Sequence, residues 1–267
     1  MNQDKVKEKL LAIQDAPLEF SLVFSGKKSK KVNGLYKPDT REIIIHNRNF
    51  AQDSAGENLL LYTAIHEFAH HLHACSRGGT LSPRAHTTEF WAIFHGLLEK
   101  AEAKKIYRDV FAGSSELAKL TEVIRNKYLK NNGALVKEMG KLLLKAHELC
   151  TGIGVRFEDY VDRMLRIPRR AANMSIKMHQ YDLDPATGPD NMSFLAGIRD
   201  EDKRNEAETA LIKGKSPDTV KMAVRGKKED EDPIARLEKE KARIERTIET
   251  LSKRLAEVKK ELGLSKW

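Results

Sequence analysis

This 267-residue sequence has few cysteines and no long apolar runs. The chain has only two cysteines, Cys75 and Cys150, which are too few for a disulfide framework or a cysteine-based zinc module. No stretch approaches the roughly 18 apolar residues that a transmembrane helix needs. The first ten residues, MNQDKVKEKL, are charged throughout and lack the apolar core of a signal peptide. These absences predict a protein without membrane spans in a reducing, cytoplasmic compartment.

The charge is unevenly distributed along the chain, which has a net charge of +9. Residues 1–103 hold 13 Lys and Arg against 12 Asp and Glu, whereas the remaining residues hold 35 against 27. Seven of the nine histidines lie in the first 103 residues. The pattern predicts that the front of the chain carries the chemistry and that the back binds a polyanionic partner.

Hydrophobic periodicity predicts an α+β fold at the front of the chain. The expected helices cover 2–14, 57–74 and 87–105, and the expected strands cover 19–26, 31–37 and 41–47. Two further helices are expected at 116–130 and 134–150, with Asn131, Asn132 and Gly133 as the break between them.

The back of the chain is predicted to be helical throughout. Short helical candidates cover 157–165, 168–180, 190–198, 200–213 and 216–224. A heptad pattern then predicts a coiled coil over 234–263, in which only Lys241 interrupts the apolar positions. We expect such a coiled coil to form a homodimer, the commonest oligomer. The alternative is a single amphipathic helix packed on its own domain. The predicted domains are 1–105 (catalytic), 106–151 (connecting helices), 152–224 (small helical), 225–233 (charged linker) and 234–263 (coiled coil).

The most informative motif is His66-Glu67-Phe68-Ala69-His70, an HExxH pattern inside a predicted helix. Residues four apart lie on one helical face, so both imidazoles can reach a single Zn²⁺ ion. Glu67 then stands beside the histidines as the general base that takes a proton from the attacking water.

Three residues compete to be the third ligand. His73 lies about 10 Å further along the same helix than His66 and is poorly placed to share the ion. Glu89 would give a site of two histidines and one glutamate. His86 follows a Gly/Ser/Pro loop that can return it over the helix, with Phe90 and Trp91 as anchors, and it is favoured here. The remaining candidates are assigned to packing or surface roles: His46, His71 and His95, with Cys75 as a small buried residue.

The segment His86-Thr87-Thr88-Glu89-Phe90-Trp91 resembles the His-x-x-x-Phe-Trp element that follows HExxH in SprT-like and YgjP-like zincins. The preceding GLYKPDTREIIIHN resembles the strand region of the same family. The resemblance covers residues 5–103 and implies a zincin-like domain in which His86 is the third zinc ligand. The family includes Spartan-type proteases that act on DNA–protein crosslinks. Its cysteine-rich zinc ribbon has no counterpart here.

A basic stretch in the back half suggests a nucleic-acid interface. No acidic residue occurs from Arg163 to Tyr181, and the helix–turn–helix rhythm of 157–180 would place a second helix in a DNA groove. The candidate DNA-binding residues are Arg163, Arg166, Arg169, Arg170 and Lys177. The alternative is a helical bundle with a solvated basic face.

Together these patterns predict a zinc endopeptidase that acts on DNA-associated proteins. One rival is a regulatory peptidase of the ImmA/IrrE type, which would use an acidic third ligand such as Glu89. The other is a non-catalytic DNA-binding or antirestriction protein of a mobile element.

Overall fold

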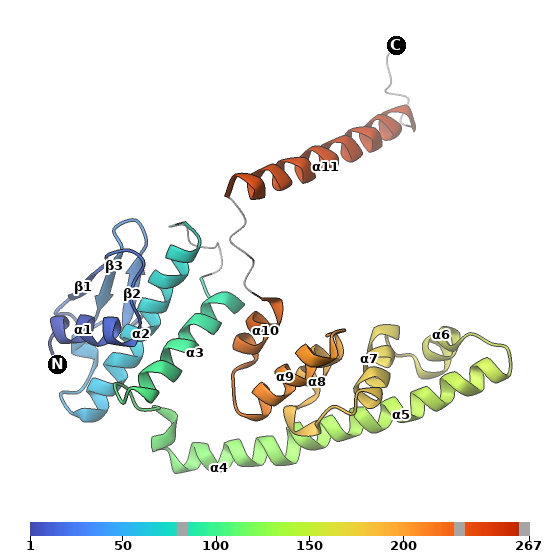
Figure 1. The fold of residues 1–267 in the computed structure, drawn as a ribbon, viewed down its shortest axis with the longest axis horizontal. Helices are drawn as coiled ribbons and strands as arrows, with labels where there is room; N and C mark the ends of the chain where they lie inside the picture. The colour runs from blue at the N-terminus through green and yellow to red at the C-terminus, as the bar shows by residue number, and fades with distance from the viewer. Residues whose placement is uncertain (79–84, 227–232, 262–267) are drawn as a thin grey trace. The chain divides into compact units, whose positions relative to one another are not determined.

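The computed structural model describes residues 1–78, 85–226 and 233–261, and it forms two units, 1–224 and 225–267. The first unit contains a small three-stranded sheet and helices α1 to α10 (Figure 1). The predicted mixture of helices and strands is therefore confirmed, with helix predominating. None of the described helices is both long enough and apolar enough to cross a bilayer.

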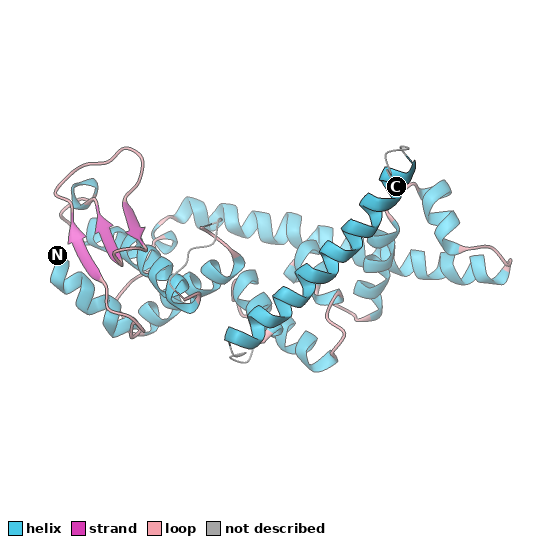
Figure 2. Ribbon diagram, turned by 90° about the horizontal axis from the view of Figure 1, so that it is seen from above, coloured by secondary structure: helices cyan, strands magenta, loops and turns pink. Residues whose placement is uncertain are grey.

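The three strands lie near the N-terminus (Figure 2). They form one sheet with the order β1-β3-β2. Its strands are β1 (Ser21–Phe24), β2 (Gly34–Lys37) and β3 (Glu42–Ile45). β3 pairs with β1 in parallel and with β2 in antiparallel orientation. Ile43 and Ile45 alternate with more exposed residues and are fully buried, as expected for a strand with one face on the core. All three strands fall inside the predicted segments but are shorter.

Three helices complete the front of the first unit: α1 (Gln3–Ile13), α2 (Ser54–Ser76) and α3 (Thr88–Ala103). The α2 helix packs against the sheet and against both other helices (Figure 1). Asp53 caps α2 by accepting a hydrogen bond from the Gly56 amide at 2.7 Å. One hydrophobic core joins these elements, and its fully buried members include Leu10, Ile43, Ile65, Phe68 and Phe90.

The predicted break at Asn131-Asn132-Gly133 is wrong. Helix α4 (Ser115–Val123) continues through a π-helical segment (Ile124–Lys130) into α5 (Asn131–Gly152), with right-handed helical dihedrals at Lys130. Gly133 serves packing instead, because a Cβ there would lie 2.7 Å from the carbonyl oxygen of Pro185. The glycine therefore allows a close tertiary approach without ending the helix.

The later part of the first unit is helical, as predicted. Its helices are α6 (Phe157–Tyr160) with a π-helical continuation (Val161–Leu165), α7 (Arg169–Gln180), α8 (Pro189–Ala196), α9 (Glu201–Ile212) and α10 (Pro217–Arg225). They enclose two small cores that are separate from the front core. The α5 and α7 helices cross closely at Gly140, where a Cβ would collide with the Ser175 backbone.

The second unit contains one long helix, α11 (Pro233–Glu261). The predicted linker at 225–233 lies largely outside the described residues, as do the last two residues of the predicted coiled coil. The helix is present where the heptads predict it, and its pairing stays a prediction.

Candidate metal centre

Helix α2 carries the HExxH motif, and its apolar surroundings explain why the motif lies in a low-dielectric site. Ala64, Ile65, Phe68 and Ala69 are fully buried around it. His70 is only 9% exposed and Glu67 only 6%. Helical spacing brings His66 and His70 to one face, with ring centroids 5.0 Å apart.

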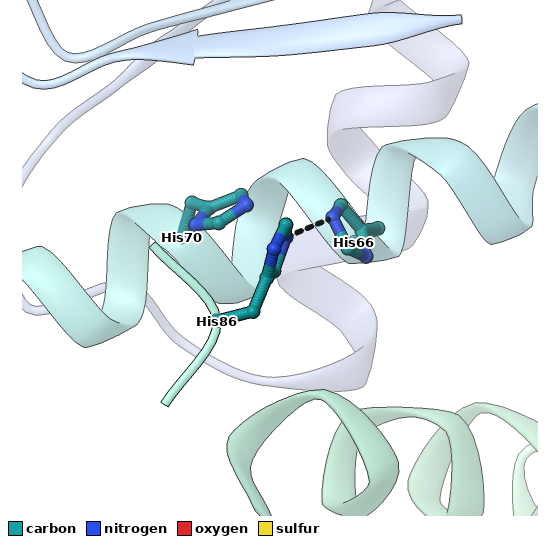
Figure 3. Close-up of side chains that lie close together, drawn as sticks. All are labelled: His66, His70 and His86. Carbon is teal, nitrogen blue, oxygen red and sulfur yellow. Dashed lines mark hydrogen bonds between the residues drawn. The ribbon is translucent and has the colours of Figure 1, made fainter. Parts of the chain in front are cut away.

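Three histidines converge at this face. One ring nitrogen each of His66, His70 and His86 lies within 4.8 Å of the others, and Figure 3 shows the rings turned toward a shared space. The Nε2 atoms of His66 and His86 are 3.2 Å apart. Two nitrogens bound at 2.0–2.1 Å to a tetrahedral zinc ion would be separated by about 3.3 Å. The spacing of this pair therefore already matches shared coordination.

Two aromatic residues at the start of α3 hold this arrangement. The fully buried Phe90 ring stacks on His70 at a centroid distance of 4.2 Å. The Trp91 ring stacks on His86 at 5.5 Å. Thr87 caps the helix by accepting a hydrogen bond from the Phe90 amide at 3.3 Å. The first turn of α3 thus holds His86 beside the two imidazoles of the motif.

The two other candidate ligands contact each other instead. Glu89 lies 3.2 Å from Arg77 and 3.5 Å from Nε2 of His73. His73 is fully buried, and its Nε2 also lies 3.5 Å from the Thr87 hydroxyl. These contacts join the end of α2 to the start of α3, where they stabilise the segment that carries His86.

Burial keeps the two histidines of the motif, His66 and His70, neutral. Desolvation, with a smaller contribution from the neighbouring histidines, lowers the pKa of His66 to about 4 and that of His70 to about 3. A neutral imidazole retains the lone pair that a metal requires. Both side chains are therefore ready to act as ligands at neutral pH.

Glu67 lies on the side of α2 that faces the sheet, and burial changes the pKa of its carboxyl group as well. Desolvation raises the pKa of its carboxyl group to about 7. A Cβ at Gly34 would lie only 3.0 Å from Cγ of Glu67 and 3.0 Å from Cγ2 of Thr63. Gly34 therefore leaves the space that the Glu67 side chain occupies beside β2.

Residue Tyr36, two positions along β2 from Gly34, completes the contact between strand and helix. Its hydroxyl lies 3.0 Å from Nδ1 of His71, and Nε2 of the same imidazole lies 3.0 Å from the Leu18 carbonyl oxygen. The Gly-x-Tyr pattern is visible in the sequence, but sequence reasoning assigned no role to Gly34 or Tyr36. Only the packing of β2 on α2 reveals these roles.

The geometry has to carry the functional argument. No protein-family model, curated protein or solved structure matches this chain. Function must accordingly be argued from the chemistry of the site itself.

The histidines assigned to packing fit that assignment. His71 is fully buried between the contacts described above, His46 contacts the Ser25 hydroxyl at 2.8 Å, and His95 contacts the Ser216 hydroxyl at 2.7 Å. The expectation that Cys75 is buried is wrong. Cys75 is half-buried because it lines a cavity of about 400 Å³ between α2 and α3.

The five candidate DNA-binding residues are all exposed, and they lie on α7 or in the segment before it. Two of them form ion pairs that the acid-free stretch did not reveal, because their partners lie just before it. Arg163 lies 3.4 Å from the Asp159 carboxylate, and Nε of Arg169 donates to the Asp162 carboxylate at 2.8 Å. Among the described residues, no ion pair involves the other three, Arg166, Arg170 and Lys177.

Proposed function

We propose that this chain is a zinc-dependent endopeptidase that acts on proteins associated with DNA. The observation that carries the proposal is the convergence of His66, His70 and His86 within 4.8 Å, beside a buried glutamate. Three imidazoles form a donor set that suits zinc, and three protein ligands leave a fourth position for water or substrate. When bound, zinc would supply Lewis-acid polarisation of a peptide carbonyl and acidification of water.

The chain's own residues supply proton transfer and orientation. Glu67 follows the first ligand in sequence, and its pKa of about 7 lies close to neutral pH, where a general base is most effective. Gly34 leaves room beside β2 for the Glu67 side chain, which is buried there. Phe90 and Trp91 orient the imidazoles and keep water away from their stacked faces.

The regulatory-peptidase alternative depends on an acidic third ligand. Glu89 is the residue that would fill this role, but its carboxylate pairs with Arg77 and His73. A site centred on Glu89 would have to break both contacts. The geometry therefore favours His86.

The DNA-linked part of the proposal rests on the charge of the back half. The chain beyond residue 103 carries 35 basic against 27 acidic residues, and Arg166, Arg170 and Lys177 project from or next to α7. We expect purified protein with zinc to cleave a DNA-bound protein faster than the same protein without DNA. Equal cleavage with and without DNA would leave a peptidase but remove its link to DNA.

The contribution of α7 can be measured separately. Replacing Arg166 and Arg170 with alanine should weaken duplex binding and reduce the slope of log affinity against log salt by about 0.9 for each phosphate that the variant no longer neutralises. Lys5→Ala combined with Lys27→Ala, two exposed lysines at the front of the chain, removes the same number of charges and should leave the slope unchanged. Equal effects of the two changes would assign binding to net charge alone.

The stability of the metal-free protein should fall as pH is lowered from about 6.5 toward 4. The unfolded chain binds protons at His66 and His70 near pH 6.5, whereas the folded chain binds them only near pH 4 and 3. Glu67 acts in the opposite direction, because its folded pKa of about 7 exceeds the ordinary value of 4.5. Glu67→Gln should consequently steepen the loss. Melting temperatures measured in chelator would contradict this if they rose on acidification.

A further inference from the structure

Helix α11 exposes a seam of large apolar side chains. Ile244, Ile248, Leu251 and Leu255 follow the three- and four-residue steps of a heptad pattern and are 46–63% exposed. Residues at such a and d positions are buried when a second helix packs against them. Within the described residues of its unit, no second element packs on this helix to cover the seam.

The charges beside the seam discriminate between two ways of pairing with a second copy. Glu240 and Arg254 occupy g positions, and Glu245 and Lys259 occupy e positions. In a parallel pair, each g residue faces the e residue of the next heptad on the other helix. Glu240 would then face Glu245, and Arg254 would face Lys259, on both sides of the seam. Each of these charged pairs in the parallel arrangement is repulsive.

Antiparallel pairing reverses this balance, because g residues then face g residues. Glu240 faces Arg254 of the second copy, and two-fold symmetry repeats this attractive pair. The repulsive pair is Glu245 with its own copy, and each Glu245 already has Lys241 of its own helix at 3.8 Å. In the same register Ile248 packs on Ile244 of the second copy.

We propose that α11 pairs with α11 of a second copy as an antiparallel coiled coil in this register. Lys241 then lies opposite Leu251 of the second copy, in the layer next to Ile244 and Ile248, and its long side chain can extend past the seam to bring the ammonium group to water. The two Pro233 ends emerge at opposite ends of the coiled coil, about 40 Å apart. The rest of each chain is thereby attached at a different end.

Cysteine crosslinking in the full-length chain tests the orientation. The native Cys75 and Cys150 are replaced by serine and alanine, and chains with Lys241→Cys are mixed with chains of different mass that carry Leu251→Cys. Mild oxidation should produce the mixed disulfide, whereas either chain alone should stay uncrosslinked, because its two cysteines would be about 15 Å apart. Disulfides formed by each chain with itself would establish parallel pairing and overturn the proposal. The absence of all crosslinks would overturn it as well.

Charge reversal provides an independent test, because it should change the dimer affinity in opposite directions for antiparallel and parallel pairing. Arg254→Glu should weaken the antiparallel dimer about tenfold, because two attractive pairs become repulsive. Adding Glu240→Arg to the same chain should restore the affinity. This rescue also controls for the contact between Arg254 and Glu257 within the helix, at 2.9 Å. In a parallel dimer Arg254→Glu would face Lys259 and raise the affinity, so tighter dimers in sedimentation equilibrium would reject the antiparallel arrangement.

Discussion

Replacing His70 with alanine is expected to reduce bound zinc from about one ion per chain to almost none. The change removes one of three converging imidazoles, and losing a direct ligand should cost more than the 10–100-fold that indirect changes cost. His66→Ala should have the same effect. Metal analysis of purified protein after dialysis against trace zinc measures the result.

A matched control separates ligand loss from general damage. His147→Ala removes an exposed imidazole on α5 and should leave zinc content unchanged. His86→Ala should resemble His70→Ala, whereas Glu89→Gln should retain the metal. Full zinc occupancy in the His70→Ala protein would reject the site, and loss of zinc in Glu89→Gln alone would favour the acidic third ligand.

Glu67→Gln is expected to retain zinc and to lose peptide hydrolysis by a factor of about 10²–10⁴, the usual contribution of a general base. Glutamine has nearly the same shape, so it fits the space beside Gly34, but it cannot accept the proton. The measurement is cleavage of a DNA-bound protein in the presence of zinc, followed over time with equal amounts of folded enzyme.

Glu8→Gln, an exposed glutamate on α1, is the control for this change and should cleave at the wild-type rate. Hydrolysis by Glu67→Gln at the wild-type rate would exclude Glu67 as the base. Absence of cleavage by wild-type protein that holds zinc would instead favour the non-catalytic alternative, in which this domain only binds.

Local patterns were sufficient for most of the front of the chain. HExxH within an apolar helical pattern placed His66 and His70 on one face, because four residues span about one helical turn. The turn signal at Pro38-Asp39 followed by REIIIHN identified β3 for the same kind of reason. Both predictions succeeded since the deciding residues are neighbours in sequence.

Predictions that depended on distant residues did less well. The Asn131–Gly133 break was wrong because the role of Gly133 depends on Pro185, 52 residues later. Cys75 was expected to be buried, but the space beside it depends on how α3 packs.

The ion pairs of Arg163 and Arg169 join residues at most seven positions apart, so the spacing of these charges could have revealed them.

By itself, the sequence determined the helix that carries the motif, the choice of His66 and His70 as candidate ligands and the seam of α11. These properties follow from periodicity and side-chain chemistry alone. Only the tertiary structure decided that His86 meets His66 and His70 while Glu89 turns to Arg77 and His73. It also decided that Gly34 makes room for Glu67. The physical reason is that a ligand set and a confined carboxylate depend on distances between separate elements, which packing alone establishes.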